Sequence, residues 1–203
     1  MNKARFEAFS DAVFAFAITL LVLGLVLPEF KAPPTDSELA RALLRLWPNA
    51  VAFILSFAVI GIMWQNHHAL FRLVHTVDRA TVMLNMGLLG LTVFIPFATS
   101  VLGSHPALRP AAFLYGLTLT GCATAYNLML GHLVRKGAFQ SHVGEAVIRQ
   151  TVHAYRVGWI TYTLAMLTSL VEPLLSFALY LLVAAYYLIP QGVDTDMEGG
   201  EEA

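Results

Sequence analysis

Long apolar stretches separated by short polar segments dominate this chain of 203 residues. A helix needs about 20 mostly apolar residues to cross the hydrocarbon core of a bilayer. Charged residues make up only 12% of the sequence and hydrophobic ones 58%, whereas soluble domains average about 25% and about 45–50%. So little charge cannot cover a soluble globule of this size. We therefore expect an all-α integral membrane protein with almost no domain outside the membrane.

The apolar stretches predict six transmembrane helices. The first ends before Pro28, and the third contains Pro96, which a membrane helix tolerates when neighbours re-satisfy the freed carbonyl. The last apolar block, 157–189, is too long for one untilted span. The Glu172-Pro173 pair near its middle predicts a turn that divides it. The predicted transmembrane domain covers residues 1–189, with spans at about 9–27, 48–64, 80–102, 111–133, 153–170 and 173–189, and the acidic tail 190–203 is predicted to be disordered.

The polar segments between the spans predict connectors and an orientation. Thr35-Asp-Ser-Glu38 supplies helix-starting residues for a short interfacial helix over 39–47. The segment 65–79 is expected to be a polar connector, and 135–156 a surface helix. Basic residues favour the cytoplasmic side of a membrane, so both termini are expected inside the cell. This orientation places eight basic residues inside (Lys3, Arg5, Arg72, Arg79, Arg135, Lys136, Arg149, Arg156) and four outside (Lys31, Arg41, Arg45, Arg109).

Polar residues at the inner end of the first span need an explanation of their own. Arg5, Ser10 and Asp11 lie there, and ionisable groups at a membrane helix are costly unless they serve a purpose. Because Arg5 and Asp11 are six positions apart, they point to different faces and are expected to reach neighbouring helices. The alternative is interfacial anchoring, with Ser10 or Asp11 as the N-cap of the helix.

Two seams run along the first span beyond Asp11. Small residues allow helices to approach closely in lipid, whereas a large apolar stripe faces lipid, the protein core or, less commonly, a pore. The chain contains no Thr-Val-Gly-Tyr-Gly segment, so any ion conduction would not use that carbonyl filter. The large seam consists of Phe9, Val13, Phe16, Leu20 and Leu23, and the small seam of Ala8, Ala12, Ala15 and Thr19.

The segment Arg5-Phe6-Glu7-Ala8-Phe9-Ser10-Asp11 resembles the Arg-x-x-x-Phe-Ser-Asp signature of the transmembrane protein 175 family of potassium channels. Animal members of this family are endosomal and lysosomal and carry two six-span repeats, whereas prokaryotic members have one. The likeness covers roughly residues 5–100. Its further matches are Trp64-Gln-Asn-His67-His68-Ala-Leu-Phe71, then Asp78 and Asn85, then Phe94-Ile-Pro96-Phe97.

This resemblance implies a potassium channel in the plasma membrane of a prokaryote, with modest selectivity over sodium. Four copies would surround a pore lined by the first helix, so the implied partners are the chain itself, lipid and potassium, with no cofactor, metal, nucleic acid or enzyme activity. Rings of bulky apolar side chains would form a dry neck that conducts once widened or wetted. Phe16 stands where the family usually has an aliphatic residue. The implied constriction and selectivity residues are Phe16, Thr19, Leu20 and Leu23, and the implied supporting network is Arg5, Phe9, Ser10, Asp11, Trp64, His67, Asp78 and Asn85.

Other functions remain open from the sequence. His67, His68 and His75 suit a polar network, a pH sensor or, with Asp78, a metal site, although no recognised ligand spacing is present. A secondary transporter would show internal repeats and broken helices. The sequence shows no convincing repeat, and Pro96 in the third span is its one sign of a broken helix. A proton-conducting protein of the same topology is a further alternative. A membrane-embedded enzyme would have to draw on Glu145, His142, His132 and His153.

Overall fold

The computed structural model describes residues 2–188, and this part of the chain is helical, which confirms the predicted all-α class. The predicted disordered tail, 190–203, lies outside the described residues. The elements are α1 (Lys3–Leu20), the 3-10 helix η1 (Leu21–Gly24), α2 (Asp36–Arg45), α3 (Trp47–Leu73), α4 (Arg79–Ser104), α5 (Arg109–Lys136), α6 (Glu145–Thr168) and α7 (Pro173–Leu188).

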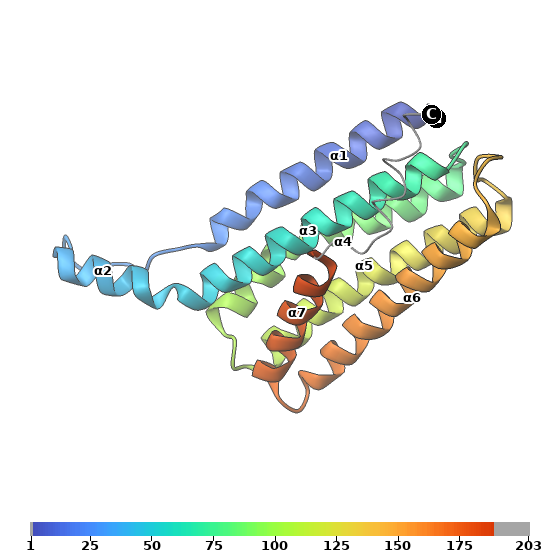
Figure 1. The fold of residues 1–203 in the computed structure, drawn as a ribbon. Helices are drawn as coiled ribbons and strands as arrows, with labels where there is room; N and C mark the ends of the chain where they lie inside the picture. Colours follow the sequence, from blue (N-terminus) through green and yellow to red (C-terminus); the bar gives the residue numbers. More distant parts are fainter. Residues whose placement is uncertain (1, 189–203) are drawn as a thin grey trace, which may run out of the picture.

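The long helices form one bundle in which α1 and α6 occupy opposite sides (Figure 1). α1 packs on α3 and α4, α5 packs between α4 and α6, and α7 contacts α6, α3 and α5. The short α2 projects at the far end, and within residues 2–188 its one helix contact is with α3. Among the described elements, α3 and α4 pack on one side of α1 and none covers the other side.

Three helical stretches of the described part are long and apolar enough to cross a membrane. They are Lys3–Gly24, Trp47–Leu73 and Arg79–Ser104, and α7 is a shorter apolar helix over Pro173–Tyr187. The chain turns between α6 and α7 at residues 169–172, beside the Glu172-Pro173 pair.

The first helix begins and ends earlier than the predicted span 9–27. Asn2 is its N-cap, because the Asn2 side chain accepts the N–H of Ala4 at 3.0 Å. The alternative in which Ser10 or Asp11 caps the helix is therefore wrong, since both lie inside α1. At the other end the chain tightens into η1, where a Cβ on Gly24 would lie 3.3 Å from the Cβ of Ser100 on α4.

The expected polar connector 65–79 is largely helical, because α3 continues to Leu73. The continued helix carries His67 into the protein interior, where its ring bonds the side chain of Asn85. His75 lies beyond the helix end and its N–H bonds the Ala138 carbonyl at 2.8 Å, so His68 and His75 do not share a helix face.

The expected surface helix 135–156 is also divided. α5 runs to Lys136 and stops at Gly137, whose left-handed backbone (φ 60°) favours glycine, and α6 begins only at Glu145. The turn between them pairs with the end of α3 through the Val74–Phe139 bridge. We call the end of the bundle that holds this turn, the α3–α4 turn and the start of α1 the polar end.

The predicted short helix before the second span is confirmed as α2, which ends at Arg45. Thr35 caps it through a capping box with Glu38. The carboxylate of Glu38 accepts the backbone N–H of Thr35 at 2.8 Å and also its hydroxyl, and these bonds lower the pKa of Glu38.

Candidate functional site

A directional chain of hydrogen bonds joins α3, α4 and α1 near the polar end. The Nε2 of His67 lies 3.0 Å from the Oδ1 of Asn85, and the Nδ2 of Asn85 donates to the Oγ of Ser10 at 2.9 Å. Ser10 in turn donates to the carbonyl of Phe6 at 3.0 Å. Because the Ser10 proton is used there, Ser10 must accept from the amide of Asn85, which leaves the amide oxygen to accept from His67. All three side chains are buried.

Aromatic rings enclose the imidazole of His67. The ring centroids of Phe6, Phe14 and Phe71 lie 5.9, 5.5 and 4.6 Å from it, and all three phenylalanines are buried. The sequence interpretation missed these rings. Their signal was spacing, since Phe6 and Phe14 are two helical turns apart on α1 and Phe71 is one turn after His67.

A second bond joins α1 to α3 at the edge of this cluster. The Nε1 of Trp64 donates to the Oδ1 of Asp11 at 2.9 Å. The structure therefore brings together five of the predicted network residues: Ser10, Asp11, Trp64, His67 and Asn85. Arg5 and Phe9 are exposed, and within residues 2–188 Arg5 forms no hydrogen bond or ion pair.

Asp78 lies outside this network and has a different role. It caps α4 by accepting the N–H and the hydroxyl of Thr81, at 2.8 and 2.7 Å. Its Oδ2 lies 2.9 Å from the Nε2 of His132 on α5. The bonds from Thr81, followed by the one from His132, hold the pKa of Asp78 well below its usual range.

The described part of the chain contains no cluster of side chains that could bind a metal ion. No three His, Cys, Asp or Glu side chains there lie close enough together to hold a metal ion. His67, His68 and His75 are separated by burial and by the end of α3, so the structure does not bring them together as ligands.

The uncovered side of α1 carries the predicted small seam and part of the large one, since Val13 of the large seam packs against the core. Phe16 and Leu23 are 60% and 69% exposed, and Thr19 is exposed between them, whereas Leu20 is partly buried at the margin. The opposite face of the helix is packed into the bundle. We call the uncovered face the α1 stripe, which consists of Ala8, Phe9, Ala12, Ala15, Phe16, Thr19, Val22 and Leu23.

Thr19 is the one hydroxyl of the α1 stripe. It donates to the carbonyl of Phe16 at 2.7 Å, so its proton is held against its own helix. The lone pairs of the hydroxyl oxygen then remain available to a cation, since within the described residues no donor bonds to this oxygen.

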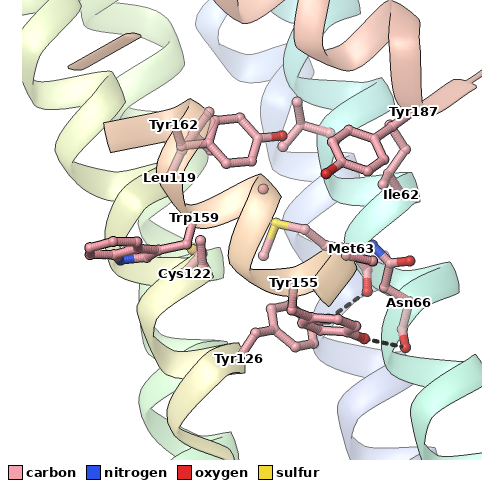
Figure 2. Close-up of a pocket in the computed structure, with 14 residues that line it drawn as sticks. Ile62, Met63, Asn66, Leu119, Cys122, Tyr126, Tyr155, Trp159, Tyr162 and Tyr187 are labelled. Atoms are coloured by element: carbon pink, nitrogen blue, oxygen red, sulfur yellow. Dashed lines mark hydrogen bonds between the residues drawn. The ribbon is translucent and has the colours of Figure 1, made fainter. Parts of the chain in front are cut away.

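A small aromatic cavity lies away from α1, between α3, α5, α6 and α7. It encloses about 100 Å³ and has no charged side chain in its lining. Figure 2 shows the hydroxyls of Tyr126 and Tyr155 bonded to α3, where they donate to the carbonyls of Met63 and Asn66. These bonds hold α5 and α6 against α3, so the cavity belongs to helix packing.

Comparison with known proteins places these features in a family context. The family model for the endosomal/lysosomal potassium channel TMEM175 matches residues 5–96. A protein of Streptomyces collinus named as a potassium channel is 38% identical over 193 residues, which is 92% of each chain. A human protein named endosomal/lysosomal proton channel TMEM175 is 35% identical over 114 residues, covering 52% of this chain and 23% of the human protein.

A solved structure matches the whole bundle. It is the crystal structure of a lysosomal potassium-selective channel TMEM175 homolog from Chamaesiphon minutus, with 36% sequence identity and a TM-score of 0.80. The match covers 92% of this chain and 96% of that one. The likeness therefore includes the later helices as well as the signature-bearing ones.

Proposed function

Because this chain belongs to the TMEM175 family of ion channels, we propose that it is a potassium channel whose pore is lined by α1 from four copies. The observation that carries the proposal is the α1 stripe, an apolar helix face that residues 2–188 leave uncovered. Six spans, formed by α1 with η1, α3, α4, α5, α6 and α7, would place this helix in the membrane of a prokaryotic cell with both termini in the cytoplasm.

The composition of the α1 stripe suits assembly around an axis. Ala8, Ala12 and Ala15 let neighbouring backbones approach closely, which is how helices associate in lipid. A closed ring of identical subunits brings the same positions of each α1 to one level. Each residue of the stripe then becomes a ring of four side chains.

The proposed constriction lies in the outer half of α1. Rings of Phe16, Leu20 and Leu23 form a narrow apolar neck that blocks ions when dry and conducts when widened or wetted. Phe16 adds a ring face that attracts a passing cation more than an aliphatic side chain does. The neck would set the conductance of the channel.

Thr19 is proposed as the source of selectivity. Its hydroxyl proton is bonded to the Phe16 carbonyl, so the oxygen offers lone pairs that replace part of an ion's hydration shell. Potassium gives up its hydration water more readily than sodium. Four hydroxyl oxygens alone therefore give a modest preference for potassium.

The buried network is proposed to set the rotation of α1 in the bundle. The bonds from Asn85 to Ser10 and from Trp64 to Asp11 hold one face of α1 against α4 and α3. Because that face is fixed, the α1 stripe on the opposite face is directed away from the bundle and toward the proposed pore axis.

Reconstitution of the purified tetramer into liposomes tests the proposal. We expect potassium flux larger than sodium flux, a reduced potassium-to-sodium ratio in Thr19→Ala, and altered conductance with a retained ratio in Phe16→Ile. Phe57→Ile is the matched control, because Phe57 is exposed to a similar degree but lies on α3. Absence of flux from well-incorporated tetramer would contradict the channel, and saturable exchange would indicate a transporter.

Proton conduction is the second candidate, favoured by the name of the human relative. The α1 stripe holds no titratable side chain, so protons would have to cross the same neck along water. Phe16→Ala would then raise potassium and proton flux together. A pH-sensitive dye inside the liposomes separates the two fluxes, and potassium flux without dye response would exclude this candidate.

A further inference from the structure

A groove between α5 and α6 lies on the side of the bundle away from α1. It has a volume of about 340 Å³ and is distinct from the aromatic cavity, although Trp159 borders both. The groove is lined by Thr124, Asn127 and Leu128 of α5 and by Arg156, Trp159 and Ile160 of α6.

Arg156 is the charged group of this groove. It is exposed, and within residues 2–188 it has no acidic partner and no hydrogen bond. Arg149, two turns earlier on the same helix, is paired with Glu145 at 3.1 Å. An arginine on a membrane helix requires a counter-charge, and long side chains reach the interface to find one.

The depth of Arg156 is fixed by its neighbour Tyr155. The carbonyl of Tyr155 accepts from Asn127 at 3.1 Å, and its hydroxyl donates to the carbonyl of Asn66 at 3.0 Å. Asn66 precedes His67, so Arg156 lies level with the buried network near the polar end. The exposed face of α6 beyond this level is apolar, with Ile160, Leu164 and Leu167.

Trp159 forms a rigid wall of the groove. Its Nε1 donates to the Oγ1 of Thr124 at 2.9 Å, which fixes the indole across the α5–α6 contact. Figure 2 shows this indole directed away from Tyr126 and Tyr155. Tryptophan at this depth is typical of the boundary between headgroups and acyl chains.

We propose that this groove binds an anionic phospholipid, with the phosphate on Arg156 and an acyl chain along Trp159, Leu128 and Ile160. The planar guanidinium donates two parallel hydrogen bonds to a phosphate. In an anionic lipid the phosphate has no cation of its own and can pair with Arg156. In a zwitterionic lipid the headgroup carries a positive charge that already neutralises the phosphate. The site requires α5 and α6 to face lipid and is independent of ion conduction.

Trp159 is a built-in reporter for this site. Bromine atoms on an acyl chain quench a tryptophan that they contact, so dibrominated phosphatidylglycerol and dibrominated phosphatidylcholine report anionic and zwitterionic lipid in turn. The experiment uses the full-length tetramer in vesicles. The Trp159→Phe variant gives the fluorescence of Trp47 and Trp64, and subtracting it from the fluorescence of the wild type leaves the contribution of Trp159.

In the wild type we expect phosphatidylglycerol to bind about fivefold more tightly than phosphatidylcholine, the effect of one arginine at a membrane surface. Arg156→Gln should reduce this ratio to about one, since only the arginine distinguishes the headgroups. Arg149→Gln is the matched control and should keep the ratio. Arg156→Lys should retain part of it, because the charge remains without the bidentate fork.

Two outcomes would overturn the proposal. One is equal quenching by both lipids in the wild type, and the other is a ratio unchanged by Arg156→Gln. If Arg156→Gln does not assemble, the preference of the wild type for phosphatidylglycerol is measured at increasing salt concentration. An electrostatic preference must weaken as the ionic strength rises, so a preference that does not change with salt would contradict the proposal.

Discussion

The two halves of the bundle hold their polar atoms in different ways. In the half formed by α1, α3 and α4, buried side chains bond one another, as in the chain from His67 through Asn85 to Ser10. In the half formed by α5, α6 and α7, hydroxyls of Tyr126, Tyr155 and Tyr180 bond backbone carbonyls. A bond between side chains constrains two residue types, whereas a bond to the backbone constrains one.

This difference bears on part of the family signature. A side-chain network requires particular residue types at set positions, and Ser10, Asp11, Trp64, His67 and Asn85 belong to both the signature and the network. Arg5 and Phe9 belong to the signature but are exposed and lie outside the network. The network therefore accounts for some of the signature residues and not for all of them.

The largest expected effect comes from Asn85→Ala. This change removes the partner of both Ser10 and His67, and a buried polar group left without its bond costs about 1–3 kcal/mol. We expect a loss of about 3 kcal/mol in the free energy of unfolding together with weaker assembly of the proposed tetramer. Unfolding of the purified protein in detergent and size-exclusion chromatography measure the two effects.

Asn127→Ala is the matched control for that variant. Within the described residues the Asn127 side chain donates to two acceptors, the carbonyls of Ala123 and Tyr155, which lie within helices. We therefore expect a loss of about 1 kcal/mol. A cost equal to that of Asn85→Ala would show that the two halves do not differ.

A smaller loss is expected from Gly116→Ala in α5. A Cβ at this position would lie 2.8 and 2.9 Å from the Cβ and Cα of Met166 and would displace the hydroxyl of Tyr180. Because the Cα of Met166 is backbone, α6 must shift, and overpacking of this kind costs about 2 kcal/mol.

The control for this variant is Gly131→Ala on the same helix, where a Cβ would meet nothing within 4 Å. Alanine is the better helix former, so this change should stabilise the protein by up to about 1 kcal/mol. Thermal unfolding of both variants beside the wild type measures the contrast. Equal midpoints for Gly116→Ala and the wild type would show that α5 and α6 are packed less closely than described.

The sequence predicted much of this molecule where local patterns decide the structure. Apolar stretches indicated the helices, and the Glu172-Pro173 pair and Thr35 marked a turn and a cap. Helix ends at the polar end were not predictable in this way. The polar residues of 65–73 indicate a connector in isolation and are helical because a neighbouring helix satisfies His67.

The residues of the candidate site were likewise predictable where a local pattern places them and unpredictable where the placement depends on a neighbouring helix. The periodicity of α1 placed Phe16, Thr19 and Leu23 on one face without knowledge of any partner. The family resemblance grouped Arg5 and Asp78 with the network, yet Arg5 is exposed and Asp78 bonds Thr81 and His132. The polar triplet Ser56, Thr99 and Tyr115, which joins α3, α4 and α5, was missed, although polar residues inside apolar spans were its signal.

Tyr155→Phe should destabilise the protein less than Asn85→Ala and Gly116→Ala do. It removes one hydrogen bond to the carbonyl of Asn66, worth about 1 kcal/mol, and keeps the aromatic ring that packs against Tyr126. Tyr155→Leu, which also removes the ring contact, should cost more. If Tyr155→Phe and Tyr155→Leu were equally destabilising, the hydroxyl bond and not the ring would carry the whole contribution of this position.

The smallest effect is expected at Asp78, which joins the two halves at the exposed start of α4. The bonds from Thr81 and His132 lower the pKa of Asp78 in the folded protein, so the carboxylate stabilises the fold above its ordinary pKa of about 4. That contribution is lost as the pH falls through the lowered folded value. The stability difference between wild type and Asp78→Ala should therefore shrink as the pH falls below about 4.

Asp78→Asn separates the cap from the charge. Asparagine caps helices as well as aspartate does, so this variant should remain more stable than Asp78→Ala at every pH. Its difference from the wild type measures what the negative charge adds to the bonds with Thr81 and His132, and it should vanish in acid, where the carboxylate is protonated. A difference that persisted in acid would mean that α4 and α5 are held together at this point by packing around Asp78 and not by its charge.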